Sequence, residues 1–471
     1  MMTLPTFTGE TAVFGLGLSG LACVDVLLLS GCEVVAWDDN PEQCALAEKR
    51  GARIRNLTQD FGTPARLILS PGIPLTHPAP HPVVMAAQQS GTEILGDMDL
   101  FQAGLDQWMG QNPEARDDVI VIGVTGTNGK STSTALIGHM LNASGWQAHI
   151  GGNIGTPILQ LEAPQQGVKT AYVLETSSYQ LALNNHLNCD FGVLTNLTPD
   201  HIERHGSMAG YIAAKQKLFA EGKAQSLRVI GTDEAEGAEM AAALASQGVA
   251  ITQISASNAD ASIHYAADGL YRQGERLMGL EFMPALRGLH NAQNAAAAFC
   301  VGEALGLSVM QITESFISFP GLAHRMQPVE GFGHLTFIND SKATNADAAR
   351  QALGACRNIY WIAGGQAKQG GLGGLENNLG EVRQAYLIGE AMALFNQQLA
   401  DMVPHLPRQD CAVLDDAVVA AANQALADDL EEATILLSPA CASFDQYASF
   451  EARGDAFCAS VAAWKQTQGG M

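Results

Sequence analysis

Short apolar runs alternate with glycine-containing turns and longer mixed runs along most of the chain. One series begins with "TAVFGLGLSG" and "EVVAWDDN", and a second contains "VIVIGVTG", "AYVLETSS", "FGVLTNLTPD" and "RVIGTD". A third contains "LTFINDS", "IYWIAGG", "AYLIGE" and "TILLSPA". Each run has the length of a strand, and helical runs lie between them. The pattern therefore predicts an α/β fold in which helices cover parallel sheets.

Three such series predict three domains, with breaks near residues 96 and 321. The predicted domains are residues 1–96, 97–321 and 322–471.

Three further segments carry their own signals. The polar residues 104–118 are typical of a linker or surface loop, and the alanine-rich residues 291–306 predict a helix. Residues 249–283 contain short strand-like pieces without a clear period, and we assign them no element.

Composition narrows the class of protein. Of 471 residues 47% are apolar, and 25 Lys and Arg against 48 Asp and Glu give a net charge of −23. So acidic a surface repels nucleic acid and anionic lipid. The nine Cys have no paired spacing, the first residues do not resemble a signal peptide, and no apolar run reaches the ~18 residues of a membrane span. We expect a cytoplasmic, monomeric protein with reduced thiols.

The stretch "VTGTNGKST" follows an apolar run and precedes a helical one. Small residues there let several backbone N–H groups face phosphate oxygens, Lys130 can reach the β- and γ-phosphates, and Ser131 can join the shell of Mg²⁺. The common phosphate-loop spacing is missed by one residue, because its first glycine would fall on Val124. The alternative is a plain strand–turn–helix. The predicted phosphate loop comprises Gly126, Thr127, Asn128, Gly129, Lys130, Ser131 and Thr132.

The first domain carries a different nucleotide signal. Gly15, Gly17 and Gly20 form a dinucleotide fingerprint after a strand, and Asp38 ends the next strand, where a ribose-binding acid is expected. Alone, this would indicate an NAD-dependent oxidoreductase. Such an enzyme leaves Lys130 unexplained, so we expect the first domain to hold another nucleotide-linked molecule.

A set of motifs resembles the Mur ligases, which build the peptide of the bacterial cell wall. The set extends in family order from residue 13 to about residue 457. Its members are "GLGLSG", "GVTGTNGKST", "GGNIG", "LETSSYQL", "NLTPDHIERH", "YIAAK", "GLHNAQNAAAA", "GLAHRM", "INDSKATN" and "LLSPACASFDQYASFEARG". Among Mur ligases it is most similar to the members that add D-glutamate.

The resemblance implies a fold and a reaction. The fold would have a dinucleotide-binding-like first domain that holds the UDP end of the substrate, a central P-loop ATPase-like domain and a Rossmann-like third domain that closes over both. ATP would phosphorylate the carboxylate of UDP-N-acetylmuramoyl-L-alanine, and the amine of D-glutamate would displace the phosphate.

The resemblance also implies a catalytic set around Mg²⁺. Glu175 ends an apolar strand and His201 follows another, and by the resemblance both match the family's magnesium residues, with Ser131. Their alternatives are a surface Glu and a helix-capping His. Lys215 matches a lysine that CO₂ carbamylates in the family, which turns a cation into an anion beside the metal. Lys217, by contrast, is expected to be an exposed helix lysine.

The remaining implied residues form three binding sets. Further ATP contacts are Asn294, Arg325 and Asp340. Residues that match the D-glutamate site are Thr344, Lys368, Ser443, Phe444 and Phe450. Residues that match the UDP-substrate site are Leu18, Ser19, Asp38, Ser70, Pro71, Gly72, Asn153 and Ser177.

Two departures and four alternatives stay open. Gln366 stands where the family usually has an Asp two residues before the lysine, and residues 38–40 lack a basic residue that some relatives carry. A sister Mur ligase would add another amino acid, and a folylpolyglutamate synthetase should lack the first domain. An NAD-dependent oxidoreductase should bind nicotinamide, and a nucleotide-gated binding protein would not need Glu175, His201 and Lys215 together.

Overall fold

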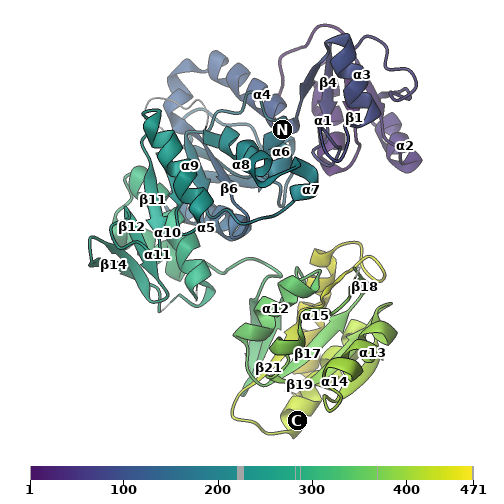
Figure 1. The fold of residues 1–471 in the computed structure, drawn as a ribbon, viewed down its shortest axis with the longest axis vertical. Coiled ribbons are helices and arrows are strands. Elements are labelled where there is room, and N and C mark those ends of the chain that lie inside the picture. The colour runs from purple at the N-terminus through teal and green to yellow at the C-terminus, as the bar shows by residue number, and fades with distance from the viewer. Residues whose placement is uncertain (1, 220–226, 282, 287, 369, 469–471) are drawn as a thin grey trace. The chain divides into compact units, whose positions relative to one another are not determined.

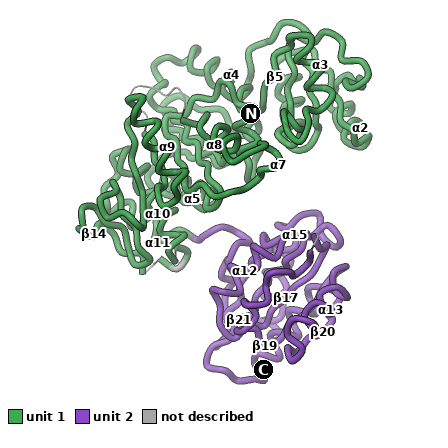
Figure 2. Tube along the Cα trace, viewed as in Figure 1, with its two compact units in different colours: residues 1–319 green, residues 320–471 purple. Residues whose placement is uncertain are grey.

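The computed structural model describes residues 2–219, 227–281, 283–286, 288–368 and 370–468. The chain forms two compact units, residues 1–319 and 320–471 (Figure 2). Each unit has its own sheets and cores, and each is described by itself (Figure 1).

The first unit begins with a five-stranded parallel sheet in the order β3-β2-β1-β4-β5. Its inner strands are buried on both faces, which is why they are continuous apolar runs. The strands are β1 (Thr11–Phe14), β2 (Val34–Trp37), β3 (Arg53–Ile54), β4 (Arg66–Leu69) and β5 (Glu93–Leu95). The helices between them are α1 (Leu18–Leu29), α2 (Pro41–Lys49) and α3 (Pro82–Ser90).

The same unit contains a nine-stranded sheet in the order β14-β13-β12-β11-β10-β9-β6-β8-β7. The strands are β6 (Val119–Thr125), β7 (Gln147–Gly152), β8 (Thr170–Glu175), β9 (Phe191–Leu194), β10 (Leu227–Gly231), β11 (Thr252–Ser255), β12 (Ile263–Ala266), β13 (Gly269–Arg272) and β14 (Glu275–Gly279). The helices are α4 (Asp97–Gln111), α5 (Lys130–Ala143), α6 (Ser178–Leu183), α7 (Ile202–His205), α8 (Met208–Gln216), α9 (Ala235–Ser246), α10 (Leu289–Ala304) and α11 (Val309–Ile317). The alanine-rich helix that the sequence predicts is confirmed as α10.

The segment left unassigned, residues 249–283, supplies one end of this sheet. Strand β11 pairs in parallel with β10, and β12, β13 and β14 follow as an antiparallel meander. In β12 buried and half-buried residues alternate, but over only four residues. A signal that short is weak, and residue 282 lies outside the described residues.

The prediction of a linker at residues 104–118 is wrong. Helix α4 continues to Gln111, and a 3₁₀ helix follows over Pro113–Asp118. Asp99 accepts a hydrogen bond at 2.8 Å from the backbone N–H of Gly96 at the helix start. Gly104 is packed so closely that a Cβ atom there would lie 3.0 Å from Sδ of Met2. Tertiary packing therefore orders a segment whose composition is that of a loop.

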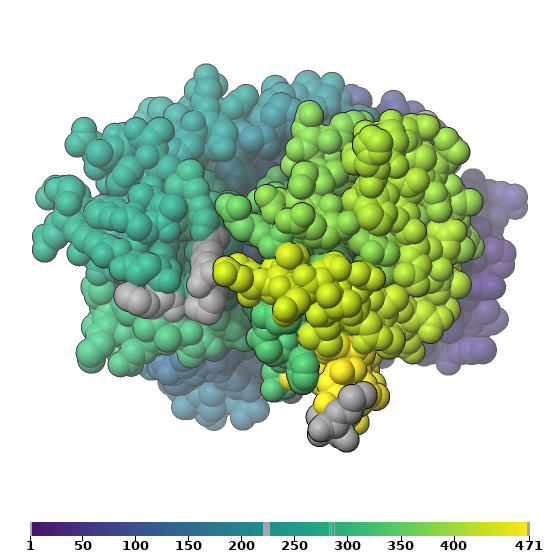
Figure 3. Space-filling model, turned by 90° about the horizontal axis from the view of Figure 1, so that it is seen from below, coloured from purple at the N-terminus to yellow at the C-terminus, as the bar shows by residue number. Residues whose placement is uncertain are grey.

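The second unit is built on a six-stranded sheet in the order β15-β16-β21-β17-β19-β20. Its strands are β15 (Gln327–Phe332), β16 (Leu335–Asn339), β17 (Ile359–Gly364), β19 (Val382–Ile388), β20 (Arg408–Ala412) and β21 (Ala433–Leu437). A two-stranded ribbon is formed by β18 (Gln366–Ala367) and β22 (Cys441–Ala442). The helices are α12 (Ala346–Ala355), α13 (Met392–Met402), α14 (Leu414–Ala427) and α15 (Phe450–Gln468), and this unit is light green to yellow in Figure 3.

Further 3₁₀ turns connect these elements at Ile158–Gln160, Lys217–Phe219, Pro284–Leu286 and Glu376–Asn378. All nine Cys are unpaired, which confirms the prediction of free thiols. Within the described ranges, no helix combines the length and the apolar character needed to cross a membrane.

Candidate active site

One cavity of the first unit collects most of the predicted first-unit site residues. Its volume is about 610 Å³, and it lies where the turns after β1 and β4 face the turns after β6 and β8. Crevices at the carboxyl ends of parallel strands are the usual ligand sites of such sheets. Its lining includes all eight predicted UDP-substrate residues, with four of the predicted phosphate and metal residues, Gly126, Lys130, His201 and Lys215.

The phosphate loop connects β6 to α5. Gly126 has φ of +148°, and a Cβ atom there would lie 1.9 Å from Oγ1 of Thr195, so only glycine fits. Helix α5 begins at Lys130, and its N-terminal dipole end therefore faces the loop. Lys130 Nζ donates to the carbonyl oxygens of Thr127 at 2.8 Å and Gly126 at 3.1 Å. The glycine turn thus leads into the positive end of a helix, which is a usual place for an anion to bind.

An amide side chain holds this loop from the side. The Oδ1 atom of Asn196 accepts from the N–H of Asn128 at 2.8 Å, and its Nδ2 donates to the carbonyl of Asn128 at 3.2 Å. The same Nδ2 donates to Gln293 Oε1 at 2.8 Å. Gln293 in turn donates to the hydroxyl of Tyr265, which donates to Asp233. The sequence contains Asn196 within "NLTPDHIERH", but its role was missed.

The predicted ATP contact Asn294 lies directly behind the loop. It is buried on α10, and its Oδ1 accepts from Ser133 Oγ at 3.0 Å. A Cβ atom at Gly129 would lie 2.4 Å from that Oδ1. Ser131 and Thr132, in the first turn of α5, are also buried. Asn294 therefore contacts both the loop and the helix that follows it.

Glu175 ends β8, as the sequence predicts, and is only 2% exposed. Its Oε1 accepts a hydrogen bond from Nδ2 of Asn153 at 2.9 Å. Its Oε2 is buried and has no hydrogen-bond partner. An unpaired buried carboxylate oxygen is costly, and a bound cation would satisfy it.

Lys215 is a buried lysine, 1% exposed, on α8. Its Nζ donates to Gly126 O at 2.8 Å and Thr125 Oγ1 at 3.1 Å, and it lies 4.8 Å from the ring centre of Tyr211. Burial, together with the charge of Lys130, lowers the pKa of Lys215 to about 7. A group with this pKa is often the neutral amine near neutral pH.

The expectation for Lys217 is corrected by the structure. This lysine is half-buried, and its Nζ donates to the carbonyl oxygens of Ala182 at 2.6 Å and Asn184 at 3.1 Å. It ties α8 to the end of α6, because those carbonyls have no further partner within the helix. Its role is structural, but it is not an exposed side chain.

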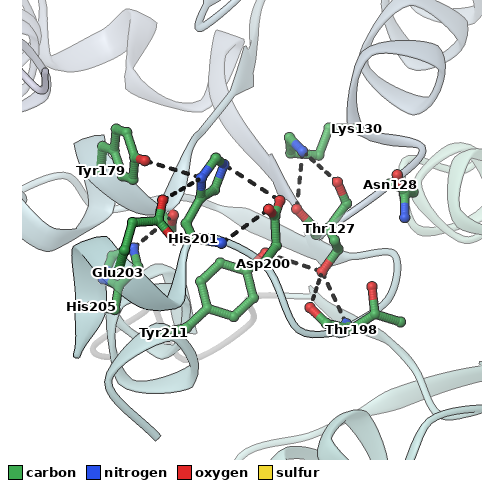
Figure 4. A network of polar contacts seen from close by, with 12 residues as sticks. Thr127, Asn128, Lys130, Tyr179, Thr198, Asp200, His201, Glu203, His205 and Tyr211 are labelled. Atoms are coloured by element: carbon green, nitrogen blue, oxygen red, sulfur yellow. Dashed lines mark hydrogen bonds and ion pairs between the residues drawn. The ribbon is translucent and has the colours of Figure 1, made fainter. Parts of the chain in front are cut away.

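His201 stands at the start of α7 with φ of +52°. Its Nδ1 lies 3.0 Å from the hydroxyl of Tyr179, and its Nε2 lies 3.4 Å from Oδ2 of Asp200 (Figure 4). The hydroxyl of Tyr211, which lines the same cavity, lies 3.0 Å from Oγ1 of Thr127 in the phosphate loop. Tyr179, Asp200 and Tyr211 line the cavity, although we had not predicted them. They fall inside the motifs quoted above, which is the signal that could have found them.

The opposite side of the cavity is formed by the first sheet. Asp38 accepts backbone N–H groups of Leu16 at 2.5 Å and Asn40 at 2.8 Å, so its carboxylate orders the turn after β1. Ser70 Oγ donates to Gly15 O at 2.6 Å. Leu18 is 79% exposed at the cavity edge.

The second unit carries the other predicted residues. Asp340 is buried and accepts from Ser438 Oγ at 2.8 Å and Met326 N at 3.1 Å. Burial raises the pKa of Asp340 to about 6. Arg325, which precedes β15 in the sequence, is exposed.

The predicted D-glutamate residues lie on three loops of that unit. Ser443 is buried after β22, Phe444 is 70% exposed, and Lys368 is exposed after β18, which pairs with β22. Thr344 precedes α12, and Phe450 begins α15. The unexpected Gln366 lies in β18 opposite Ala442.

One buried arginine connects these loops. Arg453 donates from Nη2 to the carbonyls of Ser341 at 2.9 Å and Cys441 at 3.0 Å, and from Nε to Ser341 Oγ at 3.0 Å. Ser341 Oγ donates to Phe450 O at 2.8 Å. The loops that carry Thr344, Ser443 and Phe450 are therefore joined within the second unit.

Family comparisons cover most of the chain. The Mur ligase MurD-like N-terminal domain matches residues 9–96, the Mur ligase middle domain matches residues 124–302, and the Mur ligase glutamate ligase domain matches residues 324–441.

Two relatives are named UDP-N-acetylmuramoylalanine--D-glutamate ligase. The one from Rhizobium etli is 45% identical over 466 residues, covering 96% of this chain and 95% of the relative. The one from Rhizobium meliloti is 44% identical over 476 residues, covering 98% of each.

Solved structures show the same fold. UDP-N-acetylmuramate-alanine ligase MurC from Thermotoga maritima has a TM-score of 0.55 and 15% identity, covering 98% of this chain and 100% of that one. MurF ligase from Thermotoga maritima, solved in complex with ADP, has a TM-score of 0.52 and 15% identity, covering 91% and 92%. With matches of this extent in sequence and fold, the chain belongs to the Mur ligase family.

Proposed function

We propose that this protein is the ATP-dependent ligase that joins D-glutamate to UDP-N-acetylmuramoyl-L-alanine in peptidoglycan precursor synthesis. The observation that carries the proposal is the single cavity lined by both the UDP-substrate set and the phosphate loop. A reaction between a UDP-linked carboxylate and ATP needs both in one space. The names of the relatives supply the substrates.

The first step joins two anions, and the site supplies positive potential for it. The substrate carboxylate oxygen attacks the γ-phosphorus of ATP, and ADP leaves with the bond electrons. Lys130 and the N-terminal end of α5 would offset the charge on the phosphates. The amine of D-glutamate then attacks the acyl carbon, phosphate leaves, and the amine loses a proton.

The donor set fits a magnesium ion. Ser131, Glu175 and His201 would hold it, and the unpartnered Oε2 of Glu175 supports this. When bound, the ion supplies charge neutralisation at the phosphates. Within the described residues no three His, Cys, Asp or Glu side chains converge as a metal site, so protein carboxylates alone do not complete one.

A carbamate on Lys215 would add the missing anion. The neutral amine attacks the carbon of CO₂, the nitrogen loses a proton, and a carbamate anion forms. The lowered pKa of Lys215 favours the neutral amine that this addition needs. The negative product would also remove the repulsion between Lys215 and the positive charge of Lys130.

The remaining predicted contacts belong to the second unit. Arg325 and Asp340 would contact ATP, with Arg325 at phosphate charge and Asp340 at ribose hydroxyls. Lys368, with Thr344 and Ser443, would hold the two carboxylates of D-glutamate and leave its amine free to attack. The aromatic rings of Phe444 and Phe450 would surround the same substrate.

The proposal is tested by phosphate release from ATP with UDP-N-acetylmuramoyl-L-alanine and a panel of amino acids. We expect release with D-glutamate alone among the D- and L-isomers. Release with a different amino acid would identify a sister ligase instead. Tight nicotinamide binding without phosphate release would contradict the proposal.

A further inference from the structure

One arginine joins the UDP-substrate loop to the helix that follows His201. Arg204, on α7, donates from Nη2 to the carbonyl oxygen of Pro71 at 2.9 Å and also to that of Ile73. Pro71 and Ile73 belong to the turn after β4 that lines the cavity. The contact therefore bridges more than 130 residues of sequence, from the first sheet to the second.

The same guanidinium also contacts the partner of His201. Its Cζ lies 5.1 Å from the ring centre of Tyr179, and the Tyr179 hydroxyl lies 3.0 Å from Nδ1 of His201. Figure 4 shows Tyr179 and Asp200 on opposite sides of the His201 imidazole. Pro71, Arg204, Tyr179 and His201 thus form one continuous series of contacts.

A second contact fixes the same junction. Gly206, at the end of α7, has φ of +75°, and a Cβ atom there would lie 2.4 Å from Nε2 of His77. The turn after α7 therefore packs directly on the segment that follows the UDP-substrate loop. Two contacts therefore connect α7 and the turn after it to this loop and to the segment that follows it.

Arg204 destabilises the fold more than a purely structural contact at this junction would require. Burial lowers its pKa, no ion pair to a carboxylate is present among the described residues, and its Nη1 is buried without a hydrogen-bond partner. An apolar side chain would fill such a position at lower cost. A buried polar atom without a hydrogen-bond partner calls for an explanation other than the stability of the fold.

We propose that Arg204 and Tyr179 are positioning residues that couple the UDP-substrate loop to the orientation of His201. Arg204 holds the carbonyls of the loop in place for the substrate, and its stacking fixes the Tyr179 ring. Tyr179 in turn fixes the imidazole by occupying Nδ1, which leaves Nε2 facing Asp200 in the cavity. The inference rests on the proposed function.

The test compares binding with turnover in two variants. Arg204→Met removes the donors but keeps much of the length. We expect the Kd for UDP-N-acetylmuramoyl-L-alanine, measured calorimetrically, to rise about 10–100-fold, as for loss of charge-assisted contacts. The Kd for ADP should stay within about threefold of wild type, and Arg204→Lys should recover part of the loss.

Tyr179→Phe separates the two halves of the series. It keeps the ring beneath Arg204 but removes the hydroxyl, so UDP-substrate Kd should stay near wild type. The kcat should fall roughly 10-fold or more, as for other lost partners of metal-binding histidines. In the Arg204→Met background, Tyr179→Phe should lower kcat by less than it does in wild type, because the Tyr179 ring has already lost its contact with Arg204.

Controls make the outcomes distinguishable. Arg272→Met removes an exposed arginine paired with Glu303 outside the cavity and should change none of these constants. Unchanged UDP-substrate Kd in folded Arg204→Met, or in Arg204→Lys if the first variant does not fold, would overturn the inference alone. Failure of wild-type protein to bind that substrate would overturn the proposed function and the inference with it.

Discussion

Replacing Asn196 with alanine tests how the phosphate loop is held. The side chain makes two hydrogen bonds to the backbone of Asn128 and a third to Gln293. The Asn196 amide thus pairs with the backbone of Asn128 as a neighbouring strand would, in a loop that has no strand beside it. Asn196→Ala should weaken nucleotide binding as well as the fold.

The size of the effect follows from these contacts. Gln293 is 7% exposed, so leaving its Oε1 without this donor costs about 1–3 kcal/mol. The carbonyl of Asn128 keeps a second donor, Oγ1 of Thr195 at 2.6 Å, which limits the loss there. With about 1 kcal/mol for the bond to the exposed Asn128 N–H, the free energy of unfolding should fall by about 2–4 kcal/mol.

Nucleotide affinity should fall for a separate reason. Once released, the backbone at Asn128 must be ordered again when the phosphates bind, at about 1–2 kcal/mol for one residue. ADP should therefore bind about 5–30-fold more weakly to Asn196→Ala than to wild type. Isothermal titration with ADP and Mg²⁺ measures this change, and urea unfolding without nucleotide measures the stability change.

Asn184→Ala is the matched control. Asn184 is also a buried amide of the first unit, and its Oδ1 accepts from Leu187 N at 2.9 Å, away from the phosphate loop. It should lose stability and keep wild-type ADP affinity. If Asn196→Ala shows the same behaviour as this control, the amide only supports the fold, and the reasoning about the loop is refuted.

Four further outcomes are expected. Lys130→Ala should abolish turnover and keep UDP-substrate binding, and unchanged calorimetric ATP affinity would exclude the loop assignment. Lys215→Ala should be nearly inactive, with acetate restoring part of the rate; near-normal activity of the variant without acetate would contradict the carbamate. Lys368→Ala should raise the KM for D-glutamate about 10–100-fold, from about 1.5–3 kcal/mol, whereas equal losses for all substrates would indicate a role in closure. Burial opposes ionisation of Asp233, but hydrogen bonds from Tyr265 and others lower its pKa to about 2. The stabilisation of the fold by ionised Asp233 should therefore be complete above pH ~3.9 and lost toward pH 2. The urea midpoints of wild type and Asp233→Asn, measured across that range, should converge as the pH falls.

Local chemistry made part of the site predictable. The apolar run before Gly126 ends in a turn and a helix, so the phosphate loop follows from neighbouring residues alone. Glu175 is the last residue of a run of buried residues, so it lies at the carboxyl end of β8. In both cases the signal extends over fewer than ten residues, which a sequence pattern records directly.

Contacts between distant segments were not predictable in this way. Arg204 meets Pro71 only because two sheets meet at their carboxyl edges, and no local period encodes that approach. The helix through Gly104 was missed because its polar surface resembles a linker. The residue that packs against Gly104 is Met2, which is 102 residues away in sequence. The sequence pattern indicates which face of a helix or strand is buried, but not which other segment covers that face.

Two buried side chains near the cavity, Glu175 and Lys215, are best explained together. Glu175 has a buried oxygen without a hydrogen-bond partner, and Lys215 is a buried amine that repels Lys130, yet among the described residues no ion pair joins Glu175 to Lys215. A fold selected for stability alone would bring such an acid and base together or replace both. Keeping them apart leaves a carboxylate oxygen without a partner beside the cavity-lining Asn153, and a buried amine in the cavity wall. A cation at Glu175 and a carbamate at Lys215 would satisfy both groups, and unsatisfied buried groups of this kind are what a ligand-binding site is expected to contain.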